Sequence, residues 1–134
     1  MASLSHSKIV YNVMSKKILI LDDDADALNM LSYFLSESGY EVDTLLSGEK
    51  VFEAIANFHP DLVLMDVMLA NMDGRDMRAR LRSKPETKSL PVILISVADD
   101  GFELYSPKGA PDDFLLKPFD MENLLKKVEL QLAA

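Results

Sequence analysis

The sequence predicts an α/β fold in which a doubly wound, five-stranded parallel sheet carries helices on both faces. Five short apolar runs alternate along the chain with longer segments whose apolar residues recur at helical spacing. The runs contain too few polar residues to have a wet face, which is typical of strands buried between two helical layers. Polar residues close four of the five runs, as in open sheets that bind ligands at the carboxyl ends of their strands.

Each apolar run is short enough to be a single strand. The runs are KILIL, YEVDTLL, DLVLMD, PVILIS and DFLLK, at residues 17–21, 40–46, 61–66, 91–96 and 113–117. Pro91 stands at the start of the fourth run, where a strand tolerates a missing N–H group. The sequence therefore predicts five strands, each followed by a connecting segment.

Four of the connecting segments have the apolar period of amphipathic helices, at residues 25–39, 47–58, 74–83 and 120–133. Ser47 and Asp120 are predicted N-caps, and Gly39 occupies the position of a C-terminal cap. The third of these helices has a basic face, which we interpret as solvated, with partner docking as the alternative; it is formed by Arg75, Arg78, Arg80, Arg82 and the adjacent Lys84.

The connection between the last two strands differs from the others. Residues 99–111 include Gly101, Pro107, Gly109 and Pro111, which interrupt helical structure. We expect a fourth helix of one or two turns, followed by irregular chain.

Composition limits the class of protein. The 134 residues suffice for one domain with a core, and a net charge of −8 argues against unaided binding to nucleic acid or an anionic membrane. The absence of cysteine excludes disulfides and thiolate metal sites, and no apolar run is long enough to span a membrane. We therefore expect a cytoplasmic protein. Residues 1–15 are Ser-rich without periodicity, so we expect a disordered extension before a single domain at 16–134.

Charged and polar side chains converge at the predicted carboxyl edge of the sheet. Asp22, Asp23 and Asp24 follow the first strand, while Asp66, Ser96 and Lys117 end the third, fourth and fifth. Two carboxylates about 4 Å apart repel by about 4 kcal/mol at an effective dielectric constant near 20, so a cation should relieve them. Oxygen ligands suit Mg²⁺, with Mn²⁺ second, and the hydroxyl and ammonium groups suit phosphoryl oxygens.

These motifs resemble the receiver domain of two-component response regulators. The matching pieces are ILILDDD, DLVLMDVMLANMDG, PVILIS and DDFLLKPFD, with 30 positions from Asp66 to Ser96 and 21 from Ser96 to Lys117. The resemblance covers about residues 16–133. It implies the flavodoxin-like strand order 2-1-3-4-5.

The resemblance also implies residue roles. Asp66 is the expected phosphoacceptor, and Lys117 pairs with a phosphoryl oxygen. Mg²⁺ is expected on Asp23, Asp66 and the backbone carbonyl of Met68, with Asp22 orienting the water ligands. Ser96 is expected to bind the phosphoryl group after transfer.

Two further positions belong to the expected switch. Phe114 turns inward as Ser96 moves, and Pro118 follows a cis peptide bond. The face that changes is formed by the fourth helix, the strand at 113–117 and the last helix. The phosphoryl donor is a phosphohistidine of a sensor histidine kinase or a histidine phosphotransfer protein, and the output is partner binding or onward phosphoryl relay.

A receiver is not a turnover enzyme, although it catalyses its own phosphorylation. Met68 and Ala98 flank the expected position of the attacking water, and neither side chain orients water well. We therefore predict slow self-dephosphorylation.

Two other interpretations remain open. In a haloacid dehalogenase-like phosphohydrolase, Asp22 would be the nucleophile and Ser96 and Lys117 its partners. In a degenerate receiver, the domain would be an inert interaction module. For a functional receiver we expect a monomer without an output domain, either a stand-alone protein or a piece of a longer one.

Overall fold

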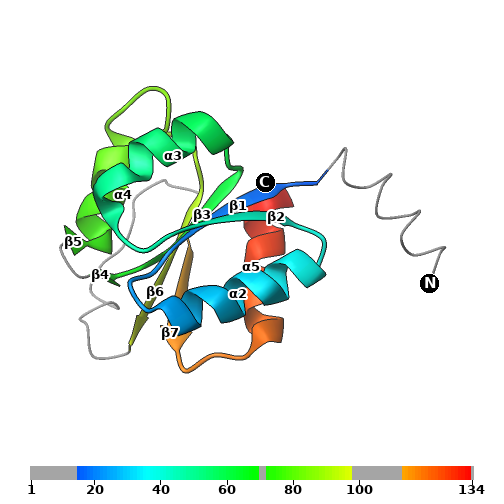
Figure 1. Cartoon of the computed structure of the whole chain (residues 1–134). Helices are drawn as coiled ribbons and strands as arrows, with labels where there is room; N and C mark the ends of the chain where they lie inside the picture. The colour runs from blue at the N-terminus through cyan, green and yellow to red at the C-terminus, as the bar shows by residue number, and fades with distance from the viewer. Residues whose placement is uncertain (1–14, 70–71, 98–112, 134) are drawn as a thin grey trace.

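The computed structural model describes residues 15–69, 72–97 and 113–133 (Figure 1). Five parallel strands form one sheet in the order β2-β1-β3-β6-β7. Their bounds are Lys17–Leu21 (β1), Glu41–Leu45 (β2), Leu62–Asp66 (β3), Val92–Val97 (β6) and Asp113–Lys117 (β7). Counted along the chain, this is the order 2-1-3-4-5, so the predicted flavodoxin-like fold is confirmed.

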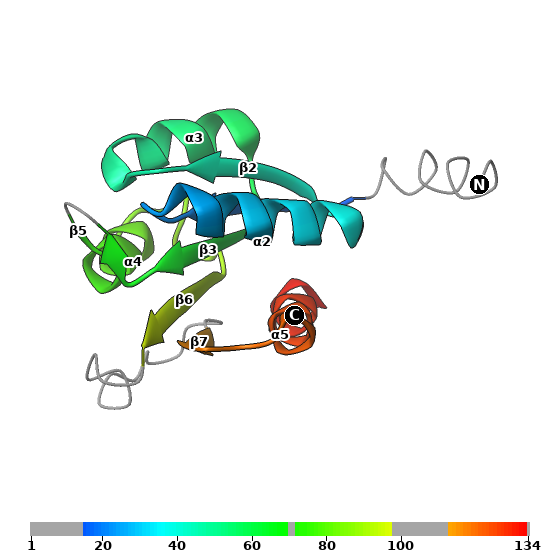
Figure 2. The ribbon, with the colours of Figure 1, turned by 60° about the horizontal axis from the view of Figure 1, so that its bottom comes forward.

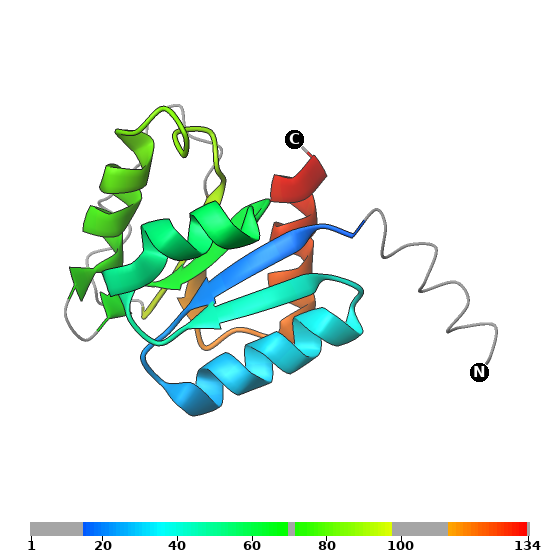
Figure 3. The same ribbon diagram turned by 45° about the horizontal axis from the view of Figure 1, so that its top comes forward.

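Two helical layers cover the sheet, with α2 and α5 on one face and α3 and α4 on the other (Figure 2, Figure 3). The helices are Ala25–Glu37 (α2), Val51–Phe58 (α3), Gly74–Arg82 (α4) and Met121–Ala133 (α5). Alternate residues of each strand enter opposite clusters: Ile18 and Ile20 pack with α2 and α5, whereas Leu19 and Leu21 pack with α3 and α4. Burial on both faces explains why the central strands are continuously apolar.

The strand β2 departs from the prediction that no strand has a wet face. Glu41 and Asp43 are exposed, and the remaining residues of β2 are only half-buried. The physical reason is its place at the edge of the sheet, where it pairs with β1 alone. Charged side chains on an edge strand also discourage pairing with another chain.

The first helix, α2, is closed at both ends, and Gly39 follows its C-terminus as predicted. The carboxylate of Asp24 accepts from the backbone N–H groups of Asp26 and Ala27, at 3.0 and 3.4 Å, and so caps α2. Gly39 follows the helix with φ of +102°, a conformation that residues with a side chain rarely adopt. The Tyr40 N–H donates to the Leu35 carbonyl and closes the turn.

Ser47 lies at an N-cap position as predicted, but it precedes a 3-10 turn instead of α3 itself. A 3-10 turn, η1 (Gly48–Lys50), precedes α3, and the Ser47 side chain makes no capping hydrogen bond. The tighter turn places Gly48 against the side-chain ends of Met72 and Met77, so packing rather than capping determines this helix start.

The interpretation of α4 as having a solvated basic face is wrong for Arg78, whose residue is only 6% exposed. Arg78 is buried on the same helix as Met77 and Leu81, which a long aliphatic stem permits for arginine. Arg75 also forms an ion pair within the protein, because its guanidinium binds the Asp73 carboxylate at 2.7 Å.

One predicted element lies outside the described residues, namely the short or irregular helix at 99–111, as does the expected extension up to residue 14. Among the helices that are described, none has the length and apolar character needed to cross a membrane.

Asp120 provides a test of the helix ends. Its carboxylate accepts from the Asn123 N–H at 2.7 Å, as predicted for an N-cap of α5. Asp120→Ala should lower the free energy of unfolding by about 1 kcal/mol, measured by urea denaturation, whereas Asp120→Ser should retain most of it because serine also caps. Equal losses in both variants would contradict the capping role.

Candidate functional site

The strand register brings the predicted site residues to one edge of the sheet. Leu21 of β1 is level with Met65 of β3, so Asp22 and Asp66 are the next positions on adjacent strands. Asp66 is level with Ile95, and Val97 with Lys117. The four strands β1, β3, β6 and β7 therefore deliver their terminal polar groups to the same place.

Asp66 is held by two donors of different kinds. The Lys117 ammonium donates to Oδ2 at 2.9 Å, and the backbone N–H of Met68 donates to Oδ1 at 2.8 Å. The Asp66 side chain is 8% exposed, whereas that of Lys117 is 38% exposed. A carboxylate fixed through both oxygens, with one narrow opening to solvent, is oriented for reaction with an incoming group.

Asp22 lies beside this pair and is buried. Its Oδ1 accepts from the Asp24 N–H at 2.9 Å. Burial raises the pKa of Asp22; the Asp24 hydrogen bond and the charge of Lys117 oppose this, while the charges of Asp66 and Asp23 add to it. The site therefore concentrates more negative charge than Lys117 alone relieves.

Lys117 stays a cation in this setting. Burial by itself lowers the pKa of its ammonium group, but the hydrogen bond and charge of Asp66, together with the charges of Asp22 and Asp24, raise the pKa overall. The protonated form can neutralise charge on an anion bound beside Asp66.

The other predicted residues are placed as follows. Ser96 is buried in β6, and its hydroxyl donates to the Val97 carbonyl at 3.0 Å. Phe114 in β7 is half-buried against the cluster under α3 and α4. The Lys117–Pro118 peptide bond is cis. Asp23 and Met68 are both exposed, so neither side chain is enclosed at the site. Ala98 lies outside the described residues.

The donor chemistry fits a hard divalent cation. The acids Asp22, Asp23 and Asp66 and the Met68 carbonyl offer oxygen only. The pKa of Asp22 is raised first by burial and further by the charges of Asp66 and Asp23, and a bound cation would favour its ionised form. Within the described ranges, no three carboxylate or imidazole side chains already form a metal-binding group. A Mg²⁺ ion here would therefore need water among its ligands, which is its usual preference.

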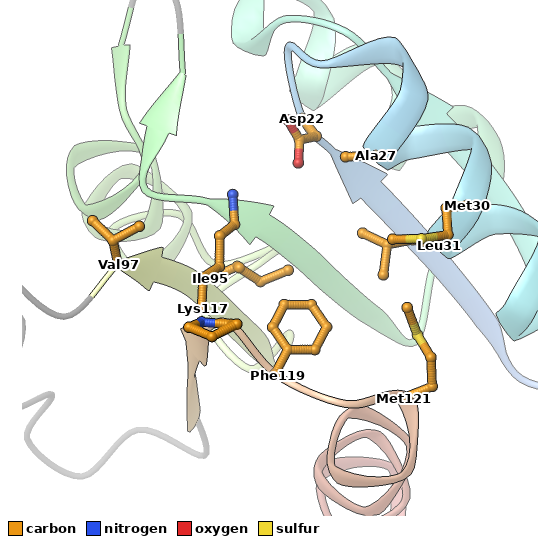
Figure 4. Close-up of a pocket in the computed structure, with 10 residues that line it drawn as sticks. Asp22, Ala27, Met30, Leu31, Ile95, Val97, Lys117, Phe119 and Met121 are labelled. Carbon is orange, nitrogen blue, oxygen red and sulfur yellow. The ribbon is translucent and has the colours of Figure 1, made fainter.

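An apolar pocket of about 450 Å³ adjoins the charged groups. Figure 4 shows Asp22 and Lys117 among the residues that line it, together with apolar side chains that include Leu31, Phe119 and Met121. The wall runs from α2 to the chain between β7 and α5.

One local structure is not predicted from the sequence: a two-stranded antiparallel ladder formed by β4 (Met68–Leu69) and β5 (Met72–Asp73). It follows Asp66 directly and leads into α4, which Asp73 caps through the Arg75 N–H at 2.8 Å. The Asp73-Gly74 pair predicts only a turn and a helix start, and the two short strands that precede Gly74 have no recognisable sequence pattern.

Comparison with known families decides the class of protein. The family model described as the response regulator receiver domain matches residues 18–129. The chain belongs to the response regulator receiver family. Receivers of this family are in general not turnover enzymes, which argues against the haloacid dehalogenase-like alternative with Asp22 as nucleophile.

Individual relatives agree with this assignment. The receiver is 32% identical over 120 residues to the phosphate regulon transcriptional regulatory protein PhoB of Rhizobium meliloti, covering 89% of this chain and 53% of PhoB. The chain thus spans about half the length of that curated relative.

Two solved structures share the fold. The signal receiver domain of a signal transduction histidine kinase from Syntrophus aciditrophicus is 30% identical with a TM-score of 0.80, covering 89% of this chain and 91% of that one. The response regulator TrrA of Thermotoga maritima, crystallised with Mg²⁺-BeF, is 28% identical with a TM-score of 0.76, covering 87% and 98%.

The raised pKa of Asp22 predicts that this residue of the proposed site lowers the stability of the folded receiver at neutral pH. The folded-state pKa lies above the ordinary value of 3.8, so ionised Asp22 destabilises the fold above the folded pKa, and this effect is absent below 3.8. Without divalent cations, Asp22→Asn should raise the free energy of unfolding at about pH 7, because asparagine keeps an oxygen for the Asp24 N–H.

The difference between Asp22→Asn and wild type should shrink as the pH falls, as measured by chemical denaturation at several pH values. Asp26→Asn is the matched control, since Asp26 is an exposed acid in the first turn of α2 and should give no gain. A less stable Asp22→Asn protein at neutral pH would contradict the prediction.

Proposed function

We propose that this receiver takes a phosphoryl group onto Asp66 from the phosphohistidine of a sensor histidine kinase or a histidine phosphotransfer protein. The observation that carries the proposal is the contact of 2.9 Å between the Lys117 ammonium and the Asp66 carboxylate, beside buried Asp22. Membership of the receiver family supports it, because phosphorylation on aspartate is the function of that family.

In the proposed transfer, an Asp66 oxygen attacks phosphorus in line with the histidine nitrogen. The O–P bond forms as the P–N bond breaks, and the nitrogen keeps the electron pair. The Met68 N–H holds Oδ1 of Asp66 in position, while Lys117 neutralises charge on the phosphoryl oxygens. Since Lys117 already binds Oδ2 of Asp66, the phosphoryl oxygens must share or replace that contact.

Mg²⁺ is the proposed cofactor, with Mn²⁺ as a substitute. Asp23, Asp66 and the Met68 carbonyl would hold it, with Asp22 binding through water. When bound, the ion supplies charge neutralisation at the phosphoryl group. Phosphoryl transfer onto a site with three acids is unfavourable without that neutralisation, because the acids repel an incoming dianion.

The proposed switch begins at Ser96 and ends at the face that includes β7 and α5. Drawing the Ser96 hydroxyl toward a phosphoryl group would break its hydrogen bond to the Val97 carbonyl. Phe114 would then move into the space left, two residues from where β7 pairs with Ser96. The ammonium of Lys127 binds Asp113 at 3.2 Å, so a shift of β7 would reach α5. The predicted fourth helix completes this face.

The output is control of partner binding or onward relay of the phosphoryl group to a second histidine. A single receiver domain, a cytoplasmic location and a monomeric state stay predictions from the sequence. Some relatives extend beyond the matched region. This receiver could therefore equally be a stand-alone protein or part of a longer regulator.

The decisive experiment uses phosphoramidate as the donor, with Mg²⁺, and mass spectrometry of the intact protein and its peptides. Wild type should gain one phosphoryl group on Asp66, and Asp66→Asn none. Lys117→Met should slow the reaction about a hundredfold, because a main charge stabiliser of the transition state is lost. Phosphorylation on Asp22 would instead support a phosphohydrolase-like site, and no modification with any donor would support an inert module.

Self-dephosphorylation should be slow, with loss of the phosphoryl group over minutes or longer after the donor is removed. Met68 offers only a weakly accepting thioether and cannot orient an attacking water. Met68→Asn should shorten the lifetime severalfold, because its amide can hold that water. Loss within seconds in wild type, or an unchanged lifetime in Met68→Asn, would contradict this prediction.

A further inference from the structure

The first residue of α4 lies against the backbone of the proposed phosphoacceptor. Gly74 is buried, and its N–H donates to the Val67 carbonyl at 2.7 Å. A Cβ atom added to Gly74 would stand 2.5 Å from the Asp66 carbonyl oxygen and 3.0 Å from the Val67 Cα atom. Both neighbours are main-chain atoms, so they cannot give way by rotating a side chain.

The segment between Asp66 and Gly74 doubles back to make this contact. Met68 pairs with Asp73 and Leu69 with Met72 in the β4–β5 ladder. Leu69 is 8% exposed and packs in the cluster under α3 and α4, which ties the ladder to the core. The chain therefore leaves Asp66, returns, and touches Asp66 again.

The same segment supplies the hydrogen bond that orients the carboxylate. The Met68 N–H donates to Oδ1 of Asp66 at 2.8 Å, and the Val67 N–H donates to the Ile95 carbonyl of β6 at 2.8 Å. Asp66 is thus fixed from β6 on one side and from the start of α4 on the other. A displacement at Gly74 would move Val67 and, with it, the Met68 donor.

We propose that Gly74 is a positioning residue for phosphorylation: the absence of a side chain lets α4 begin against the Asp66 main chain and thereby sets the aim of the Asp66 carboxylate. The inference rests on the proposed function of Asp66 as phosphoacceptor. Ordinary contact with a Cβ begins at 3.4 Å, so a methyl group at position 74 requires a shift of about 0.9 Å. Misplacement of a reacting group by about 1 Å can cost a hundredfold in rate.

Gly74→Ala tests the proposal, with Gly48→Ala as the matched glycine control. The three atoms nearest to a Cβ on Gly48 are side-chain ends of Met77 and Met72, at 3.2 to 3.7 Å, and these can move. With phosphoramidate and Mg²⁺, Gly74→Ala should lose at least tenfold in the rate of Asp66 phosphorylation, and Gly48→Ala less than twofold.

The backbone N–H of Met68 in the unphosphorylated protein reports on the position of the Asp66 carboxylate, to which it donates. Its NMR chemical shift and its protection from hydrogen exchange should change in Gly74→Ala and stay close to wild type in Gly48→Ala. Leu35→Ala provides a destabilised reference, because Leu35 is fully buried in the cluster under α2 and α5, on the other face of the sheet. Below its melting temperature, Leu35→Ala should keep both the rate and the Met68 signal.

Three results would overturn the positioning role: a wild-type rate in folded Gly74→Ala, an unchanged Met68 signal, or an equal loss of rate in Leu35→Ala. If Gly74→Ala does not fold, Leu69→Ala loosens the ladder with Gly74 intact; it should slow phosphorylation severalfold and change the Met68 signal, and no effect would overturn the role. If the wild-type protein is not phosphorylated on Asp66, the proposed function itself is wrong.

Discussion

The ion pair between Lys117 and Asp66 is the contact on which the site depends. The two residues end β7 and β3, which are not neighbours, because β6 lies between them. Their contact at 2.9 Å therefore requires both strand pairings to hold their register. A one-residue slip of β7 would turn Lys117 to the opposite face of the sheet. The two faces of β7 specify that register, because Leu115 is buried under α2 and α5 whereas Leu116 is exposed, and a slip would exchange them.

Carboxylates at the same edge of the sheet repel one another. Asp22 is buried beside Asp66, and burial together with neighbouring acids raises its pKa. Such an arrangement opposes folding, and it fits the proposed function, in which a cation and a phosphoryl group would bind there. Most of the apolar core lies away from this edge, so the fold can hold a locally unfavourable cluster.

The backbone around Asp66 contributes as much to the site as the charged side chains do. The β4–β5 ladder brings the start of α4 back to Asp66, and the Met68 N–H reaches Oδ1 of the carboxylate. The Lys117 ammonium occupies the other oxygen. The ion pair between Asp113 and Lys127 links β7 to α5. Under the proposed function, this pair would carry a shift of β7 to that helix.

The sequence by itself determined the sheet, its helices and the residue types at its carboxyl edge. The apolar runs that end in Asp22, Asp66, Ser96 and Lys117 are local patterns, and the identity of each terminal residue is visible in the chain. Tertiary structure alone decided the rest: the exposure of Glu41 and Asp43 at the sheet edge, the burial of Arg78, and the approach of Gly74 to the Asp66 carbonyl. These depend on which segments become neighbours in space, and no periodicity along the chain records that. A glycine after an aspartate predicts a turn, but only the folded chain shows which main-chain atoms leave no room for a side chain.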